Sequence, residues 1–362
     1  MREALPWVRD LAGVEQDPVH HAEGDVETHT RMACEALAGL PAWRARPADQ
    51  RVRLFAAVLL HDVAKPLCTR REEDGRITAH GHSRRGESMT RQLLWRATKS
   101  SESSPATVAW REHVAALVRH HQLPFWALER PDLRRIVFRV SLVARNDDLV
   151  LLATADILGR RCGDTSELLE NVDLYGEYCA EQRCLDRPRA FPSDHARFWF
   201  FRRPDRDPDY AAHDDTRMTV TVMSGLPGAG KDTWIRRNRP DVPVVGLDAL
   251  RTEMRVRPTD DQRPVAAAAY ERAREHLRAG RSFVWNATNV SRSLREQCVD
   301  LAAAYRARVE IVSLEAPPAV LRARLDRRGS PVPASAVERL VRRWDYPDPT
   351  EAHRLTRLVT LS

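Results

Sequence analysis

The chain has 362 residues, of which 43% are hydrophobic and 30% are charged, and this length and composition describe a soluble globular protein of two or three domains. No apolar run approaches the roughly 18 residues of a membrane span and no signal-peptide core is present, so we expect no membrane partner and a cytoplasmic location. The net charge of +7 fits a polyanionic partner, and six scattered cysteines without a Cys-x-x-Cys pair predict reduced thiols.

Histidine is concentrated in the front part of the chain, where nine of the thirteen histidines lie between His20 and His121. Three segments have apolar side chains at helical spacing, at residues 26–40, 54–61 and 149–156. On its apolar face each segment also carries one polar residue, respectively His29, His61 and Asp156. The front half is therefore predicted to be helical, with these polar groups facing an apolar interior.

These inward polar groups favour a metal site over an ordinary core. A single inward histidine is more often a hydrogen-bonded core residue than a ligand. Here Asp62 directly follows His61, and buried carboxylates and imidazoles are costly unless they are paired or bind a metal. The residues alone therefore predict a divalent-metal centre in the front half.

The order of these residues resembles the HD-domain phosphohydrolases, which have an all-α helical bundle. The motifs that carry the resemblance are His29-Thr30, Leu60-His61-Asp62-Val63-Ala64-Lys65-Pro66, His80-Gly81-His82, His120-His121-Gln122-Leu123-Pro124 and Ala155-Asp156. The resemblance implies one metal held by His29, His61, Asp62 and Asp156. It implies a second metal on two more histidines, which we assign as His82 and His121, with His80 and His120 as open alternatives.

Such a ligand set indicates the chemistry of the site. Nitrogen and oxygen ligands suit Mn²⁺, Ni²⁺, Co²⁺, Fe²⁺ or Mg²⁺, and such sites hydrolyse phosphomonoesters or cyclic phosphodiesters. By the same resemblance Lys65 contacts a phosphate of the substrate. The alternative for Lys65 is a surface lysine at the end of a helix before Pro66.

A segment without apolar periodicity, at residues 202–215, separates the histidine-rich half from the rest of the chain. We predict that it is a linker and place the domain boundary near residue 215. Residues 1–215 then form the HD phosphohydrolase domain, with its linker from about residue 202, and residues 216–362 form a second domain.

The second domain begins with a phosphate-loop pattern. The β-branched run 218–224 predicts a buried strand, and the glycine-rich sequence after it reaches Lys231, one of only three lysines among 58 Lys and Arg residues. Glycines let backbone amides point at an anion, and a lysine beside them reaches the β- and γ-phosphates of a nucleotide. The predicted nucleotide-binding residues are Gly225, Gly228, Ala229, Gly230, Lys231, Asp232 and Thr233. A glycine-rich turn without a ligand is the alternative.

Asp232 departs from this pattern, which has Ser or Thr after the lysine as a Mg²⁺ ligand. A carboxylate can also ligate Mg²⁺, directly or through water, but it is costly beside phosphates when the metal is missing. We therefore treat Asp232 as a candidate metal ligand and expect ATP, or another NTP, to bind together with Mg²⁺.

Further strands are predicted at residues 242–248, 282–289 and 309–314, with helical segments between them. This alternation predicts an α/β domain with a parallel sheet. Active groups of such domains lie at the carboxyl ends of the strands, where the sequence places Lys231, Asp248 and residues 286–289.

This set resembles the polynucleotide kinases of the phosphate-loop phosphotransferases. The resemblance implies that Asp248, three residues before Arg251, is the general base for a 5′-hydroxyl, and that a helical lid at residues 321–333 clamps the phosphates. The matching lid arginines are Arg324 and Arg328. Asn286 stands where the family has an aspartate, which leaves a metal role of this position open. The alternatives are a helix N-cap role for Asp248 and a solvated helix for each arginine.

An HD phosphohydrolase ahead of a polynucleotide kinase resembles the bifunctional bacterial end-healing enzymes. The resemblance implies phosphorylation of 5′-hydroxyl ends of RNA or DNA and removal of 2′,3′-cyclic phosphate and 3′-phosphate. We expect a separate ligase to act downstream, because no lysine here begins a Lys-x-Asp-Gly motif. Two alternatives remain: a small-molecule kinase fused to a nucleotidase-like HD domain, and a non-enzymatic, NTP-dependent nucleic-acid sensor. The sequence indicates no oligomeric state.

Overall fold

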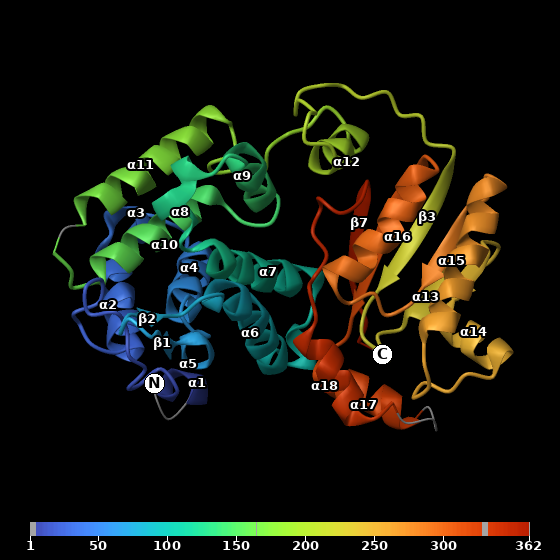
Figure 1. Ribbon diagram of the computed structural model, residues 1–362, viewed down its shortest axis with the longest axis horizontal. Helices are drawn as coiled ribbons and strands as arrows, with labels where there is room; N and C mark the ends of the chain where they lie inside the picture. Colours follow the sequence, from blue (N-terminus) through green and yellow to red (C-terminus); the bar gives the residue numbers. More distant parts are fainter. Residues whose placement is uncertain (1–4, 164, 328–331, 362) are drawn as a thin grey trace. The chain divides into compact units, whose positions relative to one another are not determined.

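The computed structural model describes residues 5–163, 165–327 and 332–361. Contacts divide the chain into two compact units, shown with their elements in Figure 1. The N-terminal unit comprises Met1–Trp95 and Val108–Arg189, and the C-terminal unit comprises Arg96–Thr107 and Ala190–Ser362.

The N-terminal unit is built from helices, with one small antiparallel hairpin of β1 (Arg70–Arg71) and β2 (Ile77–Thr78). Its longer helices are α2 (Val26–Gly39), α4 (Ala48–Leu60), α6 (His82–Ala97), α7 (Pro105–His120), α9 (Leu133–Ser141), α10 (Asn146–Leu158) and α11 (Ser166–Glu181). Shorter turns are α1 (Pro6–Arg9), α3 (Pro41–Arg44), α5 (Lys65–Cys68), α8 (Leu123–Trp126), η1 (Ser100–Glu102, assigned to the other unit) and η2 (Ala127–Glu129). The all-α prediction for this half is confirmed.

Helices α2 and α10 pack closely, and this contact positions two of the predicted ligands. The side chain of Asp25 caps α2 by accepting a hydrogen bond from the Thr28 N–H over 2.9 Å. Gly159 ends α10 against α2, and a Cβ there would lie 2.6 Å from the Ala33 nitrogen, so a larger residue would force the two helices apart. The close packing brings the buried faces of both helices together.

The C-terminal unit contains a five-stranded, fully parallel sheet in the order β4-β5-β3-β6-β7. The strands are β3 (Met218–Ser224), β4 (Val244–Gly246), β5 (Phe283–Asn286), β6 (Ala307–Glu315) and β7 (Arg354–Val359). The helices are α12 (Asp194–Arg202), α13 (Lys231–Asn238), α14 (Leu247–Met254), α15 (Arg263–Arg278), α16 (Arg292–Ala304), α17 (Pro318–Arg327) and α18 (Ala334–Arg342). The predicted α/β fold with a parallel sheet is confirmed, and β7 is an additional strand.

The strand order places the phosphate loop at the point where the chain changes direction across the sheet. Strand β3 lies between β5 and β6, and the chain builds the sheet first on one side of β3 and then on the other. In open α/β sheets this switch point, at the carboxyl ends of the strands, is where ligands bind. The fold therefore places the glycine-rich loop where a ligand crevice is expected.

Helix α12 belongs to the C-terminal unit, although the sequence placed the domain boundary after it, near residue 215. Phe198 of α12 is fully buried in the same hydrophobic cluster as Val220 of β3 and Ile311 of β6. The chain therefore enters the C-terminal unit at Ala190, and the irregular segment 203–217 runs within that unit up to β3. Burial of an aromatic side chain, which no linker pattern reveals, decides this assignment.

Candidate functional site

The N-terminal unit brings together six buried side chains that carry metal-binding atoms. They form two groups, in each of which the ligand atoms lie within 4.8 Å of one another: His29, His61 and Asp156, and then Asp62, His82 and His121. Among the described residues, His80 and His120 are in neither group. Sequence positions as distant as 29 and 156 meet here because α2, α4 and α10 pack against one another.

Asp62 lies between the two groups and presents one oxygen to each. Its Oδ2 is 3.2 Å from Nε2 of His61, and its Oδ1 is 3.4 Å from Nε2 of His82 and 3.9 Å from Nε2 of His121. On the first side, Nε2 of His29 is 3.1 Å from Oδ1 of Asp156. A carboxylate in this position can contact two cations at once.

Backbone carbonyls set the orientation of three of the histidines. His61, His82 and His121 each place Nδ1 within 2.8 Å of the carbonyl oxygen three residues earlier, and this contact requires the proton on Nδ1. Each Nε2 therefore carries no proton, and its lone pair faces the cluster and is free to bind a metal ion. A ligating histidine is commonly oriented by such a bond from its other ring nitrogen.

The donor set fits a divalent metal. Nε2 of His82 and Nε2 of His121 are 3.3 Å apart, and two lone pairs cannot form a hydrogen bond with each other. Oδ1 of the buried Asp62 also has no hydrogen-bond partner among the described residues. A cation shared by these nitrogen and oxygen atoms would satisfy all of them.

Two cationic side chains flank the metal-binding carboxylates. Nζ of Lys65 lies 2.7 Å from Oδ2 of Asp62, and Nη2 of Arg160 lies 2.9 Å from Oδ1 of Asp156. Burial acts to raise the pKa of both carboxyls, but the ammonium group of Lys65 holds the pKa of Asp62 well below its usual value, and the guanidinium group of Arg160 does so for Asp156. Both carboxylates are therefore ionised and available as ligands at neutral pH.

Two further charged residues, Arg160 and Glu23, lie beside this cluster and were not predicted from the sequence. Oε1 of Glu23 lies 3.0 Å from Nδ1 of His29 and 2.8 Å from Nδ1 of His21, and the resulting hydrogen bonds lower the pKa of Glu23 to about 2 against the opposing effect of burial. Arg160 follows Asp156 by four residues, which is a weak signal for a pair on one helix face. Glu23 lies in an irregular segment, and no sequence pattern marks it as part of a site.

A pocket of about 570 Å³ opens beside this cluster within the N-terminal unit. Lys65, His82 and Arg160 line it, together with His80 and Trp126. The volume lies in the range of small-molecule sites. The metal-binding cluster is therefore reachable by a ligand of nucleotide size.

In the C-terminal unit, glycine makes the phosphate loop possible. A Cβ on Gly225 would lie 2.4 Å from the Leu314 carbonyl oxygen, so only glycine permits this approach to β6. Gly230 has φ of +95° and is the N-cap residue of α13, a left-handed conformation that favours glycine. Helix α13 begins at Lys231, so its N-terminal amides face the loop.

The loop lysine and one lid arginine contact the loop itself. Nζ of Lys231 donates to the carbonyl oxygens of Gly225 at 2.9 Å and Leu226 at 3.1 Å. Nη1 of Arg324 donates to the carbonyl oxygen of Gly228 over 2.9 Å. Arg328, the second predicted lid arginine, lies outside the described residues.

Two predicted residues stand together at the carboxyl end of the sheet. Nδ2 of Asn286, the last residue of β5, donates to Oδ1 of Asp232 in the first turn of α13 over 2.7 Å. Thr233 follows on the same turn and is partly buried. Asp232 and Asn286 thus lie together beside the glycine-rich loop.

Asp248 lies in the first turn of α14 rather than at the end of a strand, because β4 stops at Gly246. Its side chain is 98% exposed and pairs with Nη1 of Arg251. Nε of Arg251 also donates to Oε1 of Gln262 over 2.7 Å, which holds the guanidinium group in place. The N-cap position of α14 is Gly246, so Asp248 does not serve as the helix cap.

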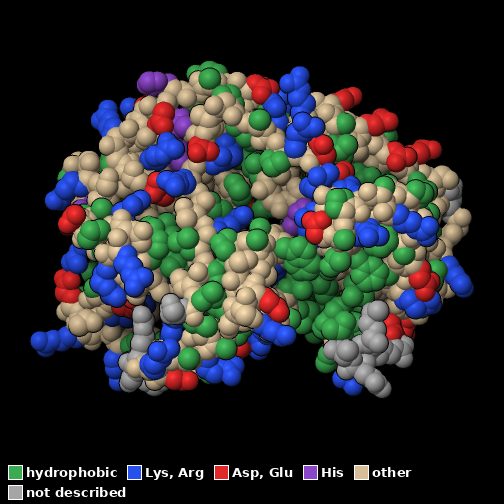
Figure 2. All heavy atoms as spheres, turned by 180° about the vertical axis from the view of Figure 1, so that it is seen from behind, with side chains coloured by type: hydrophobic (Ala, Val, Ile, Leu, Met, Phe, Trp, Pro, Cys, Tyr) green, Lys and Arg blue, Asp and Glu red, His purple; other side chains and the backbone are tan. Residues whose placement is uncertain are grey.

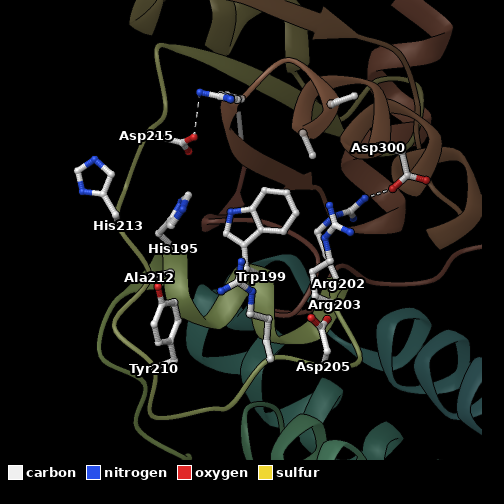
Figure 3. Close-up of a pocket in the computed structure, with 14 residues that line it drawn as sticks. His195, Trp199, Arg202, Arg203, Asp205, Tyr210, Ala212, His213, Asp215 and Asp300 are labelled. Carbon is white, nitrogen blue, oxygen red and sulfur yellow. Dashed lines mark hydrogen bonds and ion pairs between the residues drawn. The ribbon is translucent and has the colours of Figure 1, made fainter.

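The segment predicted as a linker lines a second pocket, of about 870 Å³, within the C-terminal unit (Figure 3). Arg203 lies over the ring of Trp199 at 5.5 Å, and Arg206 lies over the ring of Tyr210 at 5.2 Å. The lining has four arginines and three aspartates, namely Arg202, Arg203, Arg206, Arg306, Asp205, Asp215 and Asp300. On the face seen in Figure 2, basic side chains are likewise interspersed with acidic ones, so charge alone marks no anion site there.

Comparison with known proteins identifies both parts of the chain. Residues 25–153 match the family model of the HD domain, and residues 220–347 match that of the AAA domain. The Multifunctional CCA protein of Halorhodospira halophila is 36% identical over 126 residues, which are 34% of this chain and 26% of that protein. The A-adding tRNA nucleotidyltransferase of Deinococcus radiodurans is 34% identical over 165 residues, which are 45% of this chain and 34% of that protein. The matched part of this chain therefore spans about a quarter of the length of the Halorhodospira protein and about a third of the length of the Deinococcus protein.

The crystal structure of a gluconokinase from Sinorhizobium meliloti is 22% identical, with a TM-score of 0.30, and the match covers 40% of this chain and 83% of that one. This likeness is too low to indicate a substrate. Among the described residues, no helix combines the length and apolarity needed to cross a bilayer. Residues 25–153 are thus similar to the HD domain, and residues 220–347, which contain the glycine-rich loop, are similar to the AAA domain.

Proposed function

We propose that this protein heals nucleic-acid ends. Its HD domain removes 2′,3′-cyclic phosphate or 3′-phosphate, and its phosphate-loop domain transfers the γ-phosphate of ATP, or another NTP, to a 5′-hydroxyl. The two products are the 3′-hydroxyl and 5′-phosphate that a ligase joins, so a separate ligase acts afterwards.

The observation that carries the hydrolase proposal is the position of Asp62 between two groups of lone-pair donors. His29, His61, Asp62 and Asp156 would hold one divalent ion, and His82 and His121, together with Asp62, would hold a second. When bound, ions of the Mn²⁺, Ni²⁺, Co²⁺, Fe²⁺ or Mg²⁺ class supply an activated water and stabilise negative charge. Lys65 and Arg160 line the adjoining pocket and bind the phosphate oxygens of the substrate.

The kinase proposal depends on the groups at the carboxyl end of the sheet. Lys231 and the amides of α13 bind the β- and γ-phosphates, and Asp232 takes part in holding Mg²⁺. Asp248 accepts the proton of the attacking hydroxyl, with Arg251 fixing its carboxylate, while Arg324 and Arg328 stabilise the transferred charge.

The exposure of Asp248 favours a polymer end over an enclosed small molecule as phosphate acceptor. Because its side chain is 98% exposed, this carboxylate is accessible to the terminal 5′-hydroxyl of a polynucleotide. A pocket that encloses a small substrate would bury most of that substrate and its catalytic groups. The name of one relative, the A-adding tRNA nucleotidyltransferase, also supports RNA as a partner.

The decisive test uses an oligonucleotide with a 5′-hydroxyl and a 3′-phosphate, labelled ATP, Mg²⁺ and Mn²⁺. We expect label transfer to the 5′ end and release of the 3′-phosphate. Lys231→Ala should abolish only the transfer, and Asp62→Ala should abolish only the release. Lys99→Ala is the matched control, because Lys99 is exposed and lies in neither site.

The alternatives predict different outcomes. Reaction of a free nucleoside or sugar, with no reaction of the oligonucleotide, would establish a small-molecule kinase fused to a nucleotidase. NTP-dependent binding of the oligonucleotide without any reaction would establish a sensor. Either result would overturn the end-healing proposal.

A further inference from the structure

The pocket beside the metal-binding cluster is lined by cationic and polar side chains and also by aromatic rings. Lys65, Arg160 and His82 line it where it adjoins the carboxylates, and Trp126 also lines it. Trp126 is 54% exposed, whereas the preceding Phe125 is 2% exposed. The pocket thus contains an exposed indole near groups that attract phosphate.

Trp126 is 54% exposed and is not part of the hydrophobic cluster that buries Phe125. Phe125 fills the core beside α10 and α11, with the Arg160 guanidinium carbon 5.0 Å from its ring centroid. Both rings of the short helix α8 line the pocket, but Phe125 is buried in the core, whereas Trp126 is more than half exposed. A large exposed ring in a pocket is available for contact with a flat ligand.

We propose that Trp126 stacks on the base of the nucleotide whose 3′-phosphate, or 2′,3′-cyclic phosphate, lies at the metal-binding cluster. The inference rests on the proposed phosphohydrolase function and specifies its substrate as a nucleotide unit rather than any phosphate ester. Every base has a π-face, so stacking selects for a base without selecting its identity. Lys65 and Arg160 bind the phosphate, and Trp126 determines that the phosphate belongs to a nucleotide.

A double-mutant-type cycle, which combines substitution of Trp126 in the protein with removal of the terminal base from the substrate, tests this role. The full-length protein and its Trp126→Ala variant are assayed with Mn²⁺ on two oligonucleotides with a 3′-phosphate, one intact and one lacking the terminal base. For the intact oligonucleotide we expect the variant to raise KM by roughly 5- to 150-fold, with a smaller change in kcat. On the abasic oligonucleotide both proteins should have the same KM, because the interaction is already missing.

Two further variants separate stacking from damage to the fold. Trp126→Phe keeps a ring and should retain most of the affinity. Leu128→Ala removes a 49% exposed side chain from the same segment outside the pocket lining and should leave KM unchanged. Equal losses of Trp126→Ala on the intact and abasic substrates would overturn the inference, because a general structural defect affects both.

The experiment also separates this inference from the proposed function. If the wild-type protein releases phosphate from glycerol phosphate but from neither oligonucleotide, the end-healing proposal fails together with the inference. If it releases phosphate from both oligonucleotides with equal KM, hydrolysis of 3′-phosphate ends stands and only the role of Trp126 is wrong.

Discussion

Asn286 donates a hydrogen bond from Nδ2 to Oδ1 of Asp232 over 2.7 Å, and this bond joins the end of β5 to the first turn of α13. These are two positions at which the chain departs from the patterns that it resembles. In phosphate-loop NTPases the loop provides a Ser or Thr and a neighbouring strand provides an Asp for Mg²⁺. In this chain the carboxylate is that of Asp232, directly after the loop in the first turn of α13, and the neutral side chain is that of Asn286 at the end of β5.

We therefore predict that Asp232→Ser changes nucleotide binding in opposite directions with and without metal. Binding of ATP with Mg²⁺ should weaken about tenfold, because a metal ligand is weakened. Binding of ATP in EDTA should strengthen, because a negative charge beside the phosphates is removed. Isothermal titration calorimetry with both solutions measures the two affinities.

The reciprocal variant Asp232→Ser/Asn286→Asp serves as the control, since it returns the carboxylate to the strand. It should recover most of the affinity for ATP with Mg²⁺ that the single substitution loses. Unchanged binding of the single variant in both solutions would show that Asp232 has no part in holding the metal.

Arg160→Gln should impair the hydrolase site without affecting kinase activity. Arg160 contacts Asp156 and lines the pocket, so its loss weakens both the orientation of a ligand carboxylate and the binding of phosphate. We expect kcat/KM on a 3′-phosphate end to fall roughly 10- to 100-fold. Arg161→Gln is the matched control, because Arg161 contacts Glu23 through its backbone N–H, which the substitution leaves in place.

Arg295→Met should destabilise the C-terminal unit strongly. Arg295 is fully buried, and its Nε and Nη2 donate to the two carboxylate oxygens of Glu351 at 2.7 and 3.0 Å. Removal of Arg295 leaves the buried Glu351 carboxylate with the more distant Arg292, at 3.9 Å, as its cationic neighbour, and breaking such a buried pair costs about 3–5 kcal/mol. Urea unfolding of the variant measures this loss, and Arg295→Met/Glu351→Leu should regain much of it because no unpaired charge remains.

The buried carboxylate of Glu112 should make stability depend on pH below about 4.5. Burial acts to raise its pKa, but Arg91 and Arg111, which lie 2.8 Å from its oxygens, lower the pKa below the usual 4.5. The ionised form therefore contributes stability that is complete above about pH 4.5 and is lost as the pH falls through the lowered folded pKa.

Glu112→Gln removes this contribution. At pH 7 the variant should have a lower free energy of unfolding than the wild type, and the difference should shrink as the pH falls through the folded pKa of Glu112. Urea unfolding of both proteins between pH 3 and pH 7 checks this. A difference that stays constant over the whole range would contradict the prediction.

The sequence predicted the fold class and many of the elements because their signals are local. The run of β-branched residues at 218–224 coincides with β3, and apolar helical spacing located α2, α4 and α10. Strand β7 was not predicted, because Arg354 and Arg357 interrupt its apolar side chains. Its place beside β6 follows only from the tertiary pairing of the two strands. Similarly, Phe198 assigns α12 to the C-terminal unit through contacts with residues far along the chain.

For the candidate sites, the sequence by itself determined which residue types were available: inward histidines and carboxylates in one half, and a glycine-rich loop with a rare lysine in the other. Only the tertiary structure decided which of them meet. It separated His82 from His80 and His121 from His120, since one or two steps along the chain change the direction of a side chain. It also revealed Arg160, Glu23 and the pairing of Asp232 with Asn286, because contacts between distant segments depend on packing that no local pattern encodes.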